Sequence, residues 1–527
     1  MKILFVWPNK DQFGFKPMGI SLLSAILKQA GHQVELFDTT FIDFGFSGNT
    51  EVRQRIKIFK DVDFSGYNIK KKPLDLKKTF HQKLESFQPD LLAFSVLSDE
   101  VALGRELSRL AKEWKKEVPV LWGNKAVTMA PSSILQDKNI DYACVGEAIE
   151  FLPEFVRRME QGLEMATLPN LAYRCKNGEI KVNPLKDYYQ QLDKLPFFDW
   201  SIFDQRQFLK PYDGKVYRGG DHMLFWGCPN RCTYCINEAY RQLYGKKAGT
   251  FLRHYSVGRI IAELAQLVKE WQIEFFKFHD EDFCLKPMPF FQELAEAYAR
   301  EIKVPFTIMA NAKNIDAAKV RLLKKMNCVS VTLGIETGND ELRKNILLRR
   351  ETREDIIAAT RLLNQAGIRT SAFNMLGIPF ENRKTVMETI ALNRAAEVRY
   401  PNAGFFFPLE GTALRQIAIE NGFYSAENGR VFQNDMPTLK FKDISEEELV
   451  ALRERFALYV KMPEQYYKYI ERSEKNDPIG QKLTAELYHI YQECVFAHDG
   501  VWNDGGRLEE HLCQLRSIIS QGSSEVT

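Results

Sequence analysis

The sequence lacks the features that mark membrane, secreted and nucleic-acid-binding proteins. No segment reaches the roughly 18 consecutive apolar residues of a membrane span. The apolar start, MKILFVWPN, has no small-residue cleavage site and predicts a buried first strand rather than a signal peptide. The formal net charge of +3 over 527 residues gives no bulk charge for holding a nucleic acid. We therefore expect a cytoplasmic protein without a membrane span and without a nucleic-acid partner.

Cysteine is scarce and unevenly placed. Three of the nine cysteines lie within eight positions, at 228, 232 and 235. The other six are scattered along the chain: Cys144, Cys175, Cys284, Cys328, Cys494 and Cys513. Such a distribution indicates one metal site and ordinary thiols in a reducing compartment, and not a framework of disulfides.

Residues 1–160 alternate apolar segments with amphipathic ones, a pattern typical of a doubly wound α/β domain. Helices such as Ile20–Ala30 and Leu103–Trp114 would cover the sheet, whereas the polar stretch Phe41–Pro89 is interpreted as an elaboration outside the core. The predicted strands are Ile3–Trp7, Val34–Asp38, Leu91–Val96, Val118–Trp122 and Tyr142–Val145.

A connector is predicted over residues 161–215, with a hairpin at Asn177-Gly178. A second alternating series over residues 216–428 predicts a partial (β/α)6 barrel, whose reactive end lies at the carboxyl ends of its strands. Residues 429–527 are predicted to be helical, with aromatic residues that form packing core, and to cap the barrel mouth. The predicted barrel strands are Met223–Trp226, Phe275–His279, Phe306–Ala310, Ser330–Gly334, Ser371–Leu376 and Ala403–Phe407.

The clustered cysteines follow an apolar segment in the sequence FWGCPNRCTYCIN, which spans Phe225–Asn237. Three thiolates on one short loop can bind three irons of a cubane cluster and leave the fourth iron open to a cofactor or substrate. The alternative is a zinc site, in which His222 or His279 would complete a Cys3His set. The spacing favours the cluster, because zinc sites usually contain two Cys-x2-Cys pairs and this chain has one.

The octapeptide CPNRCTYC, with Tyr234 directly before its third cysteine, resembles the signature of the radical S-adenosylmethionine (SAM) superfamily. The resemblance covers roughly Asp221–Gly422. It implies a [4Fe–4S] cluster on Cys228, Cys232 and Cys235, with SAM chelating the open iron. One electron, supplied by an external donor such as flavodoxin or ferredoxin, would cleave SAM to a 5′-deoxyadenosyl radical.

Further motifs follow in the order found in that superfamily. FKFHDEDF resembles the polar end of the second barrel strand, VTLGIETG the fourth strand and FNMLGIPFE the fifth, while PLEGTAL resembles a Pro-Gly-Thr turn from which Glu410 departs. Carboxylates at such positions can accept hydrogen bonds from an ammonium group or from ribose hydroxyls. The SAM contacts that the resemblance implies are Tyr234, Asp280, Glu281, Asp282, Glu336, Asn374 and Gly377.

The amino-terminal domain lacks a Gly-x-Gly-x-x-Gly motif, which argues against a dinucleotide. It resembles the cobalamin-binding domain that precedes many radical SAM enzymes, through Ser95-Val96-Leu97 and through Gly123-Asn124, where asparagine replaces the second glycine. The Asp-x-His-x-x-Gly element is missing, so cobalamin would bind base-off without a histidine ligand. The alternative is a domain that has kept the fold and lost the ligand. The implied contacts are Pro17, Gly19, Ser95, Val96, Leu97, Gly123, Asn124, Gly146 and Glu147.

Together these resemblances imply a cobalamin-dependent radical SAM enzyme that methylates an unactivated carbon of a small-molecule or lipid substrate. Relatives with the same two domains also catalyse rearrangements or oxidative cyclisations without methyl transfer, and that alternative stays open at this point. A non-catalytic iron–sulfur or cobalamin-binding protein is the alternative from another class. It does not account for a three-cysteine site with an open iron.

Overall fold

The computed structural model describes residues 1–10, 13–43, 60, 62–69, 71–245, 251–425 and 436–524. The chain forms two compact units. The first unit comprises Met1–Gly48, Val62–Glu281 and Leu409–Arg415, and the second comprises Asn49–Asp61, Asp282–Pro408 and Gln416–Thr527.

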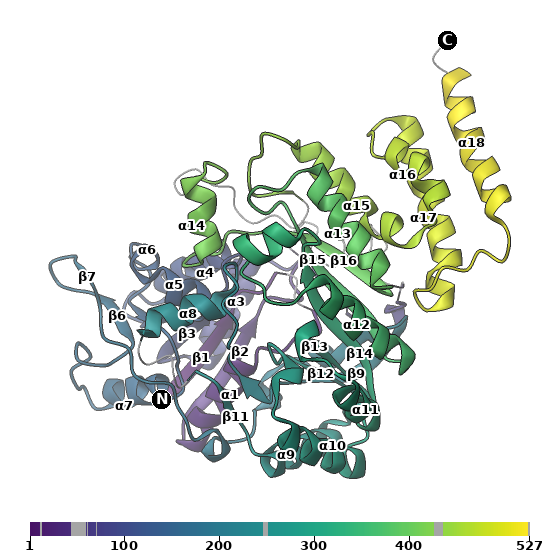
Figure 1. The fold of residues 1–527 in the computed structure, drawn as a ribbon. Coiled ribbons are helices and arrows are strands. Elements are labelled where there is room, and N and C mark those ends of the chain that lie inside the picture. The colour runs from purple at the N-terminus through teal and green to yellow at the C-terminus, as the bar shows by residue number, and fades with distance from the viewer. Residues whose placement is uncertain are drawn as a thin grey trace. The chain divides into compact units, whose positions relative to one another are not determined.

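The first unit contains a seven-stranded sheet in the order β2-β1-β3-β4-β5-β6-β7 (Figure 1). Strands β1 to β5 are parallel, and β6 and β7 add an antiparallel hairpin at one edge. The order 2-1-3-4-5 is that of a doubly wound sheet, whose ligands bind where the order reverses between β1 and β3. The strands are β1 Lys2–Trp7, β2 Gln33–Asp38, β3 Leu91–Ser95, β4 Val120–Gly123, β5 Tyr142–Cys144, β6 Leu171–Arg174 and β7 Ile180–Val182.

Amphipathic helices connect these strands and bury their apolar sides. Helix α4 approaches β4 closely because Gly104 has no side chain, and a Cβ there would lie 2.8 Å from the Trp122 ring. The interpretation of Phe41–Pro89 as an elaboration was wrong for its last part. Residues Leu76–Phe87 form α3, the crossover helix between β2 and β3, and Phe80 and Leu84 are fully buried in the core. Residues 44–59 lie outside the described part of the chain. The other helices are α1 Met18–Gln29, α4 Val101–Trp114, α5 Lys125–Met129, α6 Pro131–Ile134 and α7 Phe151–Glu160.

The first barrel strand lies earlier in the chain than Met223–Trp226, the segment predicted from the sequence. Strand β9, Lys215–His222, pairs with β8, Leu209–Tyr212, in an antiparallel hairpin. Asp213-Gly214 forms the turn, with positive φ angles of 50° and 77°. That dipeptide is a hairpin signal which the sequence analysis did not use. On its other side, β9 pairs in parallel with β12, Phe275–Phe278.

The remaining barrel strands belong to the second unit, where β13, β14, β15 and β16 pair in parallel in chain order. Helices precede or connect these strands, as expected of a (β/α) series. The strands are β13 Phe306–Ala310, β14 Cys328–Glu336, β15 Arg369–Leu376 and β16 Tyr400–Phe405. The helices of the whole barrel region are α8 Ile236–Tyr244, α9 Val257–Trp271, α10 Met288–Glu301, α11 Ala317–Lys325, α12 Arg353–Gln365, α13 Arg383–Ala395 and α14 Ala413–Glu420.

Four helices follow in the carboxyl-terminal region. Helix α15 packs against α13 and β16, and its buried side chains share one hydrophobic core with Leu376, Val386 and Ile390. The region therefore extends the wall of the second unit, and the expectation that it caps the barrel mouth stays a prediction. Most of the aromatic residues predicted to be core are buried, namely Tyr466, Tyr469, Tyr488, Tyr491 and Phe496. Tyr467 and Trp502 are half-buried, and His489 is exposed. These helices are α15 Glu446–Lys461, α16 Tyr467–Ser473, α17 Pro478–Cys494 and α18 Leu508–Ser524, the last two side by side in Figure 1.

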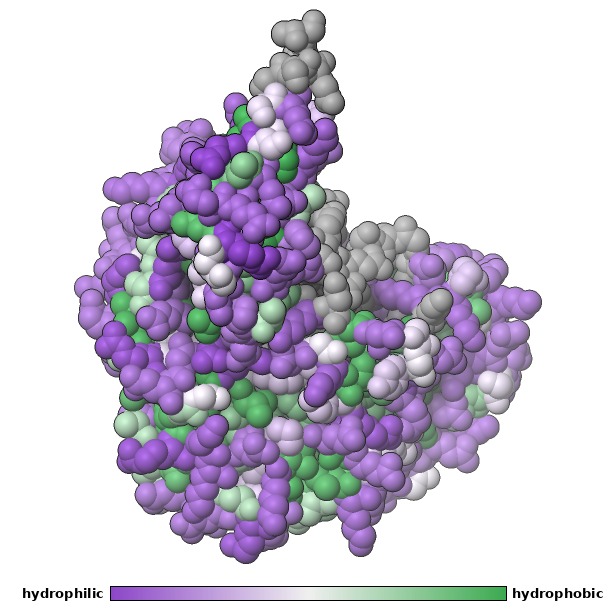
Figure 2. All heavy atoms as spheres, turned by 90° about the vertical axis from the view of Figure 1, so that its right-hand side faces the viewer, coloured by the Kyte–Doolittle hydropathy of each residue, from purple (hydrophilic) through white to green (hydrophobic). Residues whose placement is uncertain are grey.

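The exposed face drawn in Figure 2 is mostly hydrophilic, with hydrophobic residues in small scattered patches. Within the described part of the chain, no helix is both long enough and apolar enough to cross a membrane.

Candidate functional site

The three clustered cysteines, called the cysteine triad from here on, lie on a loop between a short strand and a helix of the first unit. Strand β10, Phe225–Trp226, pairs with β11, Arg253–His254, and the loop then leads to Cys235, the residue that caps α8. Gly227 turns the chain with a φ of +89°, and a Cβ at this position would lie 2.6 Å from a backbone oxygen. Only glycine fits both conditions without strain.

The triad cysteines are close enough to influence one another. The pKa of Cys235 is raised to about 12, mainly by burial; the Asn237 backbone N–H opposes the rise, and the charges of Glu281, Cys232 and Cys228 contribute to it. A thiol with so high a pKa binds metal only where a cation compensates the thiolate, as irons of a cluster would. None of the nine cysteines forms a disulfide.

The described residues contain no group of three or more His, Cys, Asp or Glu side chains arranged to hold a single metal ion. The two histidines of the zinc alternative have other neighbours. His222 Nε2 lies 3.2 Å from Glu263, and His279 Nε2 lies 2.7 Å from Asp221.

The acidic residues after β12 have different surroundings. Asp280 is fully buried and accepts the backbone N–H groups of Leu224 and Phe225 at 3.0 and 3.1 Å, so it fixes the segment that leads into the triad loop. Glu281 is exposed, and its charge acts on Cys235. Of these two residues of the first unit, Glu281 is the better placed to receive a ligand.

Asp282 belongs to the second unit, and its side chain is hydrogen-bonded to other groups of the protein. Its carboxylate accepts hydrogen bonds from the Cys284 backbone N–H at 3.1 Å and the Asn314 side chain at 2.6 Å. Burial raises its pKa despite these bonds. A role for Asp282 in SAM binding stays a prediction, and the structure gives the residue a clear structural role.

Glu336 ends β14 at a bulge in the strand register. Its φ is +64°, a left-handed conformation that is rare for glutamate and is found most often where a site requires it. Its side chain is largely buried, and Arg349 Nη1 lies 3.5 Å away. A carboxylate held at a strand end in this way is suited to accepting a hydrogen bond from a ligand.

Two predicted SAM contacts follow on β15 and beyond it. The Asn374 side chain is engaged with Asn393 and with the Asn402 carbonyl, at 2.7 to 3.2 Å. Gly377 has a φ of +73°, and its N–H donates to Glu381. Burial raises the pKa of Glu381 to about 8. The glycine therefore contributes backbone conformation, while the Asn374 amide is already satisfied.

The turn predicted after the last strand belongs to the first unit and contacts the triad loop. The Leu414 N–H donates to the Thr233 carbonyl at 2.9 Å, next to Tyr234. Glu410, the departure from the usual turn, pairs with Arg415 at 2.7 Å. The turn thus holds the segment that carries Tyr234 in place.

The predicted cobalamin contacts lie at the carboxyl ends of the sheet. Gly19 is exposed in the first turn of α1, which Pro17 precedes, and a Cβ there would meet nothing within 4 Å. Asn124 has a φ of +86°, so it keeps the backbone of the glycine that it replaces, and its side chain donates to Ser95 at 3.0 Å. A Cβ at Gly123 would make only an ordinary 3.7 Å contact.

The segment Gly146-Glu147 is engaged differently, by the helix that follows the triad. The Tyr244 hydroxyl on α8 accepts the Glu147 N–H at 3.0 Å, and a Cβ at Gly146 would lie 2.3 Å from that oxygen. The Glu147 carboxylate pairs with Arg253 at 2.8 Å. These residues connect the sheet to the triad segment, and their contact with cobalamin stays a prediction.

Sequence reasoning missed a buried carboxylate beside Ser95-Val96-Leu97. Glu100 accepts the Leu97 N–H at 2.8 Å and the Trp7 indole N–H at 3.2 Å, and burial raises its pKa to about 8. Glu100 therefore sets the path of the loop between β3 and α4. No local pattern pointed to this residue, because an acid at the start of a helix is usually a solvated cap.

A second missed feature is a buried ionic network in the first unit. Asp221 is fully buried, lies 2.9 Å from Lys16 Nζ and 2.8 Å from Lys210 Nζ, and contacts His279 at 2.7 Å. Burial alone raises the pKa of Asp221, but the two ammonium groups hold it well below the ordinary value. Burial lowers the pKa of Lys16 to about 8. The network joins the segment before Pro17 to the residue before Asp280.

Comparisons with known proteins agree with this geometry. Residues 224–392 match the Radical SAM superfamily, and residues 11–156 match the B12 binding domain. The chain is 22% identical over 460 residues to an uncharacterized methyltransferase of Pyrococcus horikoshii, covering 86% of this chain and 90% of that protein. It is 23% identical over 406 residues to the anaerobic magnesium-protoporphyrin IX monomethyl ester cyclase of Rubrivivax gelatinosus, covering 75% and 66%.

Two solved structures share the fold. The radical SAM methyltransferase TsrM from Kitasatospora setae, with tryptophan and a SAM analogue bound, has a TM-score of 0.60 at 18% identity, over 88% of this chain and 84% of that one. The cobalamin-dependent SAM radical enzyme OxsB, with aqua-cobalamin and SAM bound, has a TM-score of 0.61 at 14% identity, over 94% and 72%.

The predicted fold class is confirmed: a Rossmann-like cobalamin-binding domain, a partial radical SAM barrel and a helical carboxyl-terminal region. The predicted domain boundaries at 160, 215 and 428 stay predictions. The superfamily implies a [4Fe–4S] cluster and SAM as cofactors, and the B12 binding domain implies cobalamin. The chain therefore combines a domain of the Radical SAM superfamily with a B12 binding domain.

Proposed function

We propose that this enzyme transfers a methyl group to an unactivated carbon of a small-molecule or lipid substrate. The observation that carries the proposal is the presence of both matched domains in one chain, at residues 11–156 and 224–392. It is supported by the likeness to a methyltransferase of Pyrococcus horikoshii over most of both chains. When bound, the cluster and SAM would supply a 5′-deoxyadenosyl radical, and cobalamin would supply the methyl group.

The protein's own residues would hold and orient these groups. The cysteine triad would bind the cluster, and Glu336, fixed by the strand bulge and by Arg349, would accept a hydrogen bond from the ribose. Ser95, Gly123 and Gly19 leave room at the strand ends for a large flat ligand. No histidine belongs to the predicted cobalamin contacts, so we expect base-off cobalamin without a histidine ligand.

The electron that starts the reaction would come from an external donor such as flavodoxin or ferredoxin. We also propose that the enzyme works in the cytoplasm, where reducing conditions protect an open cluster. A reduced donor protein should replace dithionite in driving SAM cleavage, and this can be measured as 5′-deoxyadenosine formed under anaerobic conditions.

Oxidative cyclisation is the second candidate function. It is favoured by the likeness to the anaerobic cyclases, at 23% identity over 406 residues and 24% over 430 residues. The two functions differ in the fate of the SAM methyl group. Methylation places it on the product, whereas cyclisation consumes SAM without placing a methyl group on the product.

The test begins with anaerobic purification and measurement of iron and cobalt. The reduced enzyme is then incubated with methyl-labelled SAM and candidate substrates, and 5′-deoxyadenosine and labelled product are quantified. Label in the product supports methylation, and 5′-deoxyadenosine with an unlabelled, modified substrate supports cyclisation or rearrangement. Failure of the iron-loaded, reduced enzyme to cleave SAM would overturn both.

A further inference from the structure

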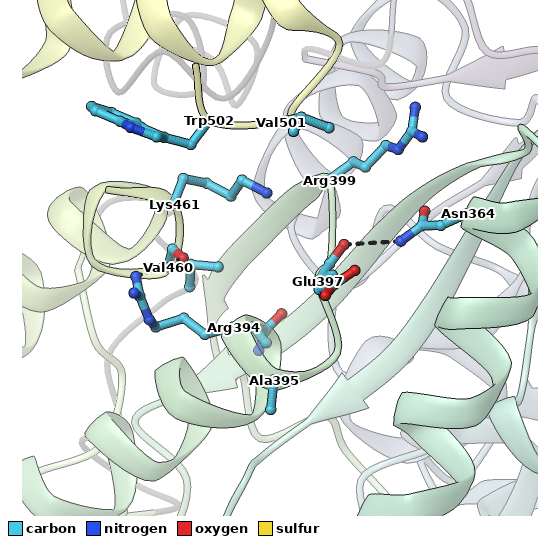
Figure 3. Close-up of a pocket in the computed structure, with 10 residues that line it drawn as sticks. Asn364, Arg394, Ala395, Glu397, Arg399, Val460, Lys461, Val501 and Trp502 are labelled. Carbon is cyan, nitrogen blue, oxygen red and sulfur yellow. Dashed lines mark hydrogen bonds between the residues drawn. The ribbon is translucent and has the colours of Figure 1, made fainter. Parts of the chain in front are cut away.

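A pocket of about 490 Å³ lies in the second unit, and none of its lining residues is a predicted cofactor contact (Figure 3). Its walls come from the carboxyl ends of α12, α13 and α15 and from the loop before α18. The lining residues are Asn364, Asn393, Arg394, Ala395, Glu397, Arg399, Val460, Lys461, Val501 and Trp502.

The pocket lies at the amino ends of the barrel strands. Asn364 lies at the end of the helix that leads into β15, and Glu397 and Arg399 directly precede β16. Glu336 and Gly377, by contrast, are at the carboxyl ends of β14 and β15. The reactive end of such a barrel is the carboxyl end of its strands, so this pocket is not the radical site.

Two arginines are held rigidly at the pocket. Arg394 Nη1 donates to the carbonyls of Tyr459, Val460 and Met462 at the end of α15, at 2.7 to 3.0 Å. Arg399 pairs with Asp499. Cations at helix carboxyl ends offset the negative end of the helix dipole, which is a structural role. Their positive charge nevertheless stays at the pocket.

Lys461 makes fewer hydrogen bonds than Arg394, and unlike Arg399 it is not paired with a carboxylate in the part of the chain that the structure describes. Its ammonium has three donors, and among the described residues its one hydrogen bond goes to the Val398 carbonyl, at 3.0 Å. Burial, together with the charges of Arg399 and Arg394, lowers its pKa to about 8, and the charge of Glu397 opposes this shift. Glu397 is exposed and does not form an ion pair with it. In Figure 3 the Lys461 side chain extends toward the Glu397–Arg399 segment.

We propose that this pocket binds a small oxyanion, a phosphate ester or a carboxylate, between Lys461 and Arg399. An anion there would accept hydrogen bonds from the remaining N–H donors of Lys461, and its negative charge would reduce the repulsion among the three cations. Charge-assisted hydrogen bonds of this kind are the strong ones. Val501 and Trp502 offer apolar surface to the rest of such a molecule.

The probe for the test is sulfate, because its charge does not change between pH 7 and 9. Sulfate is titrated calorimetrically into the full-length, cluster-loaded protein at constant ionic strength, and succinate is titrated in parallel to compare a carboxylate. The test variant is Lys461→Met. The matched control is Lys482→Met, which removes an exposed lysine of α17 that does not line the pocket.

We expect Lys461→Met to weaken sulfate binding at least tenfold at pH 7 and Lys482→Met to leave it unchanged. Between pH 7 and 9 the wild type should lose about tenfold in affinity, because the protonated fraction of a group with pKa about 8 falls by that factor. The arginine and carboxylate groups facing Lys461 do not as a rule titrate in this range. Lys461→Met should show no such pH dependence.

Equal sulfate affinity in the wild type and in Lys461→Met would overturn the proposal and leave Lys461 as a cap for the Val398 carbonyl. Should Lys461→Met fail to fold, Lys461→Arg decides the question. This variant keeps the charge, so the proposal requires it to bind sulfate at both pH values with little change. Stronger binding of sulfate than of succinate would identify a phosphate-like ligand, and the reverse a carboxylate.

Discussion

Replacing Asp221 with Asn tests the buried network that joins the two functional parts of the first unit. The change keeps the shape of the side chain and removes the charge that compensates Lys16 and Lys210, whose Nζ atoms lie 2.9 and 2.8 Å from the carboxylate. Lys16 and Asp221 are fully buried. Breaking a buried ion pair by removing one partner typically costs about 3–5 kcal/mol, because the remaining charge stays buried without its partner.

The structure also sets an upper limit on this loss. A buried lysine that has lost its carboxylate partner can become neutral by releasing its proton. For a lysine with an ordinary pKa of 10.5, this deprotonation costs about 5 kcal/mol at pH 7. At pH 9.5 the same deprotonation costs only about 1.4 kcal/mol. Between these pH values the unfolded variant binds a proton that the folded variant has released, so the stability of the variant rises with pH relative to wild type.

The assay is urea unfolding of the full-length chain, followed by tryptophan fluorescence and circular dichroism at pH 7 and pH 9.5. Asp221→Asn should lower the free energy of unfolding by about 3–5 kcal/mol at pH 7 and by about 1–2 kcal/mol at pH 9.5. The control is Asp204→Asn, which weakens a partly exposed pair with Arg206 and should cost less than about 1 kcal/mol. A loss below about 1 kcal/mol at pH 7, or one that grows with pH, would refute the reasoning.

Four further predictions concern the cofactors. Changing all three triad cysteines to Ala should remove essentially all iron and the brown absorption, whereas Cys284→Ala should keep both; full iron in the triple variant would contradict the assignment. Glu336→Gln should weaken SAM binding by about 1–3 kcal/mol with iron unchanged, and unchanged affinity would make Glu336 structural. Gly123→Leu should abolish methyl transfer and spare SAM cleavage and iron content, as measured by product analysis. The bound cob(II)alamin of the wild type should show an electron paramagnetic spectrum without nitrogen splitting, and a nitrogen-coupled signal would contradict the absence of a histidine ligand.

The parts of the fold that followed from the sequence are those in which local pattern and burial agree. Phe306–Ala310 was predicted with its observed bounds and Leu103–Trp114 lies within the observed α4, because an apolar strand or an amphipathic helix carries its own period. The Lys215–His222 strand was missed because it is polar and contains two glycines. Its burial comes from Lys210 and Lys16, which fill space beside it and neutralise Asp221.

The residues of the candidate site also fall into two groups, those that a local sequence pattern identifies and those that only tertiary contacts identify. The triad was found because three cysteines at fixed spacing carry their chemistry in the sequence itself. The motif carboxylates were found as a group, but only tertiary contacts distinguish them. Asp280 and Asp282 are committed to protein N–H groups, while Glu281 is exposed. An acid at a strand end has the same appearance in sequence whether it binds a ligand or the backbone.

Helix α8 explains how the first unit can link its two predicted cofactor sites. Cys235 caps its first turn, and the Tyr244 hydroxyl at its last turn accepts the Glu147 N–H, one residue beyond Gly146. A nine-residue helix is rigid, and the stacking of Tyr244 on Tyr188 at 3.9 Å fixes its far end. The distance between the triad and the Gly146 loop is therefore set by one helix rather than by a flexible linker. A radical enzyme that passes a group between two cofactors needs such a fixed spacing, because misplacement by about 1 Å can cost a hundredfold in rate.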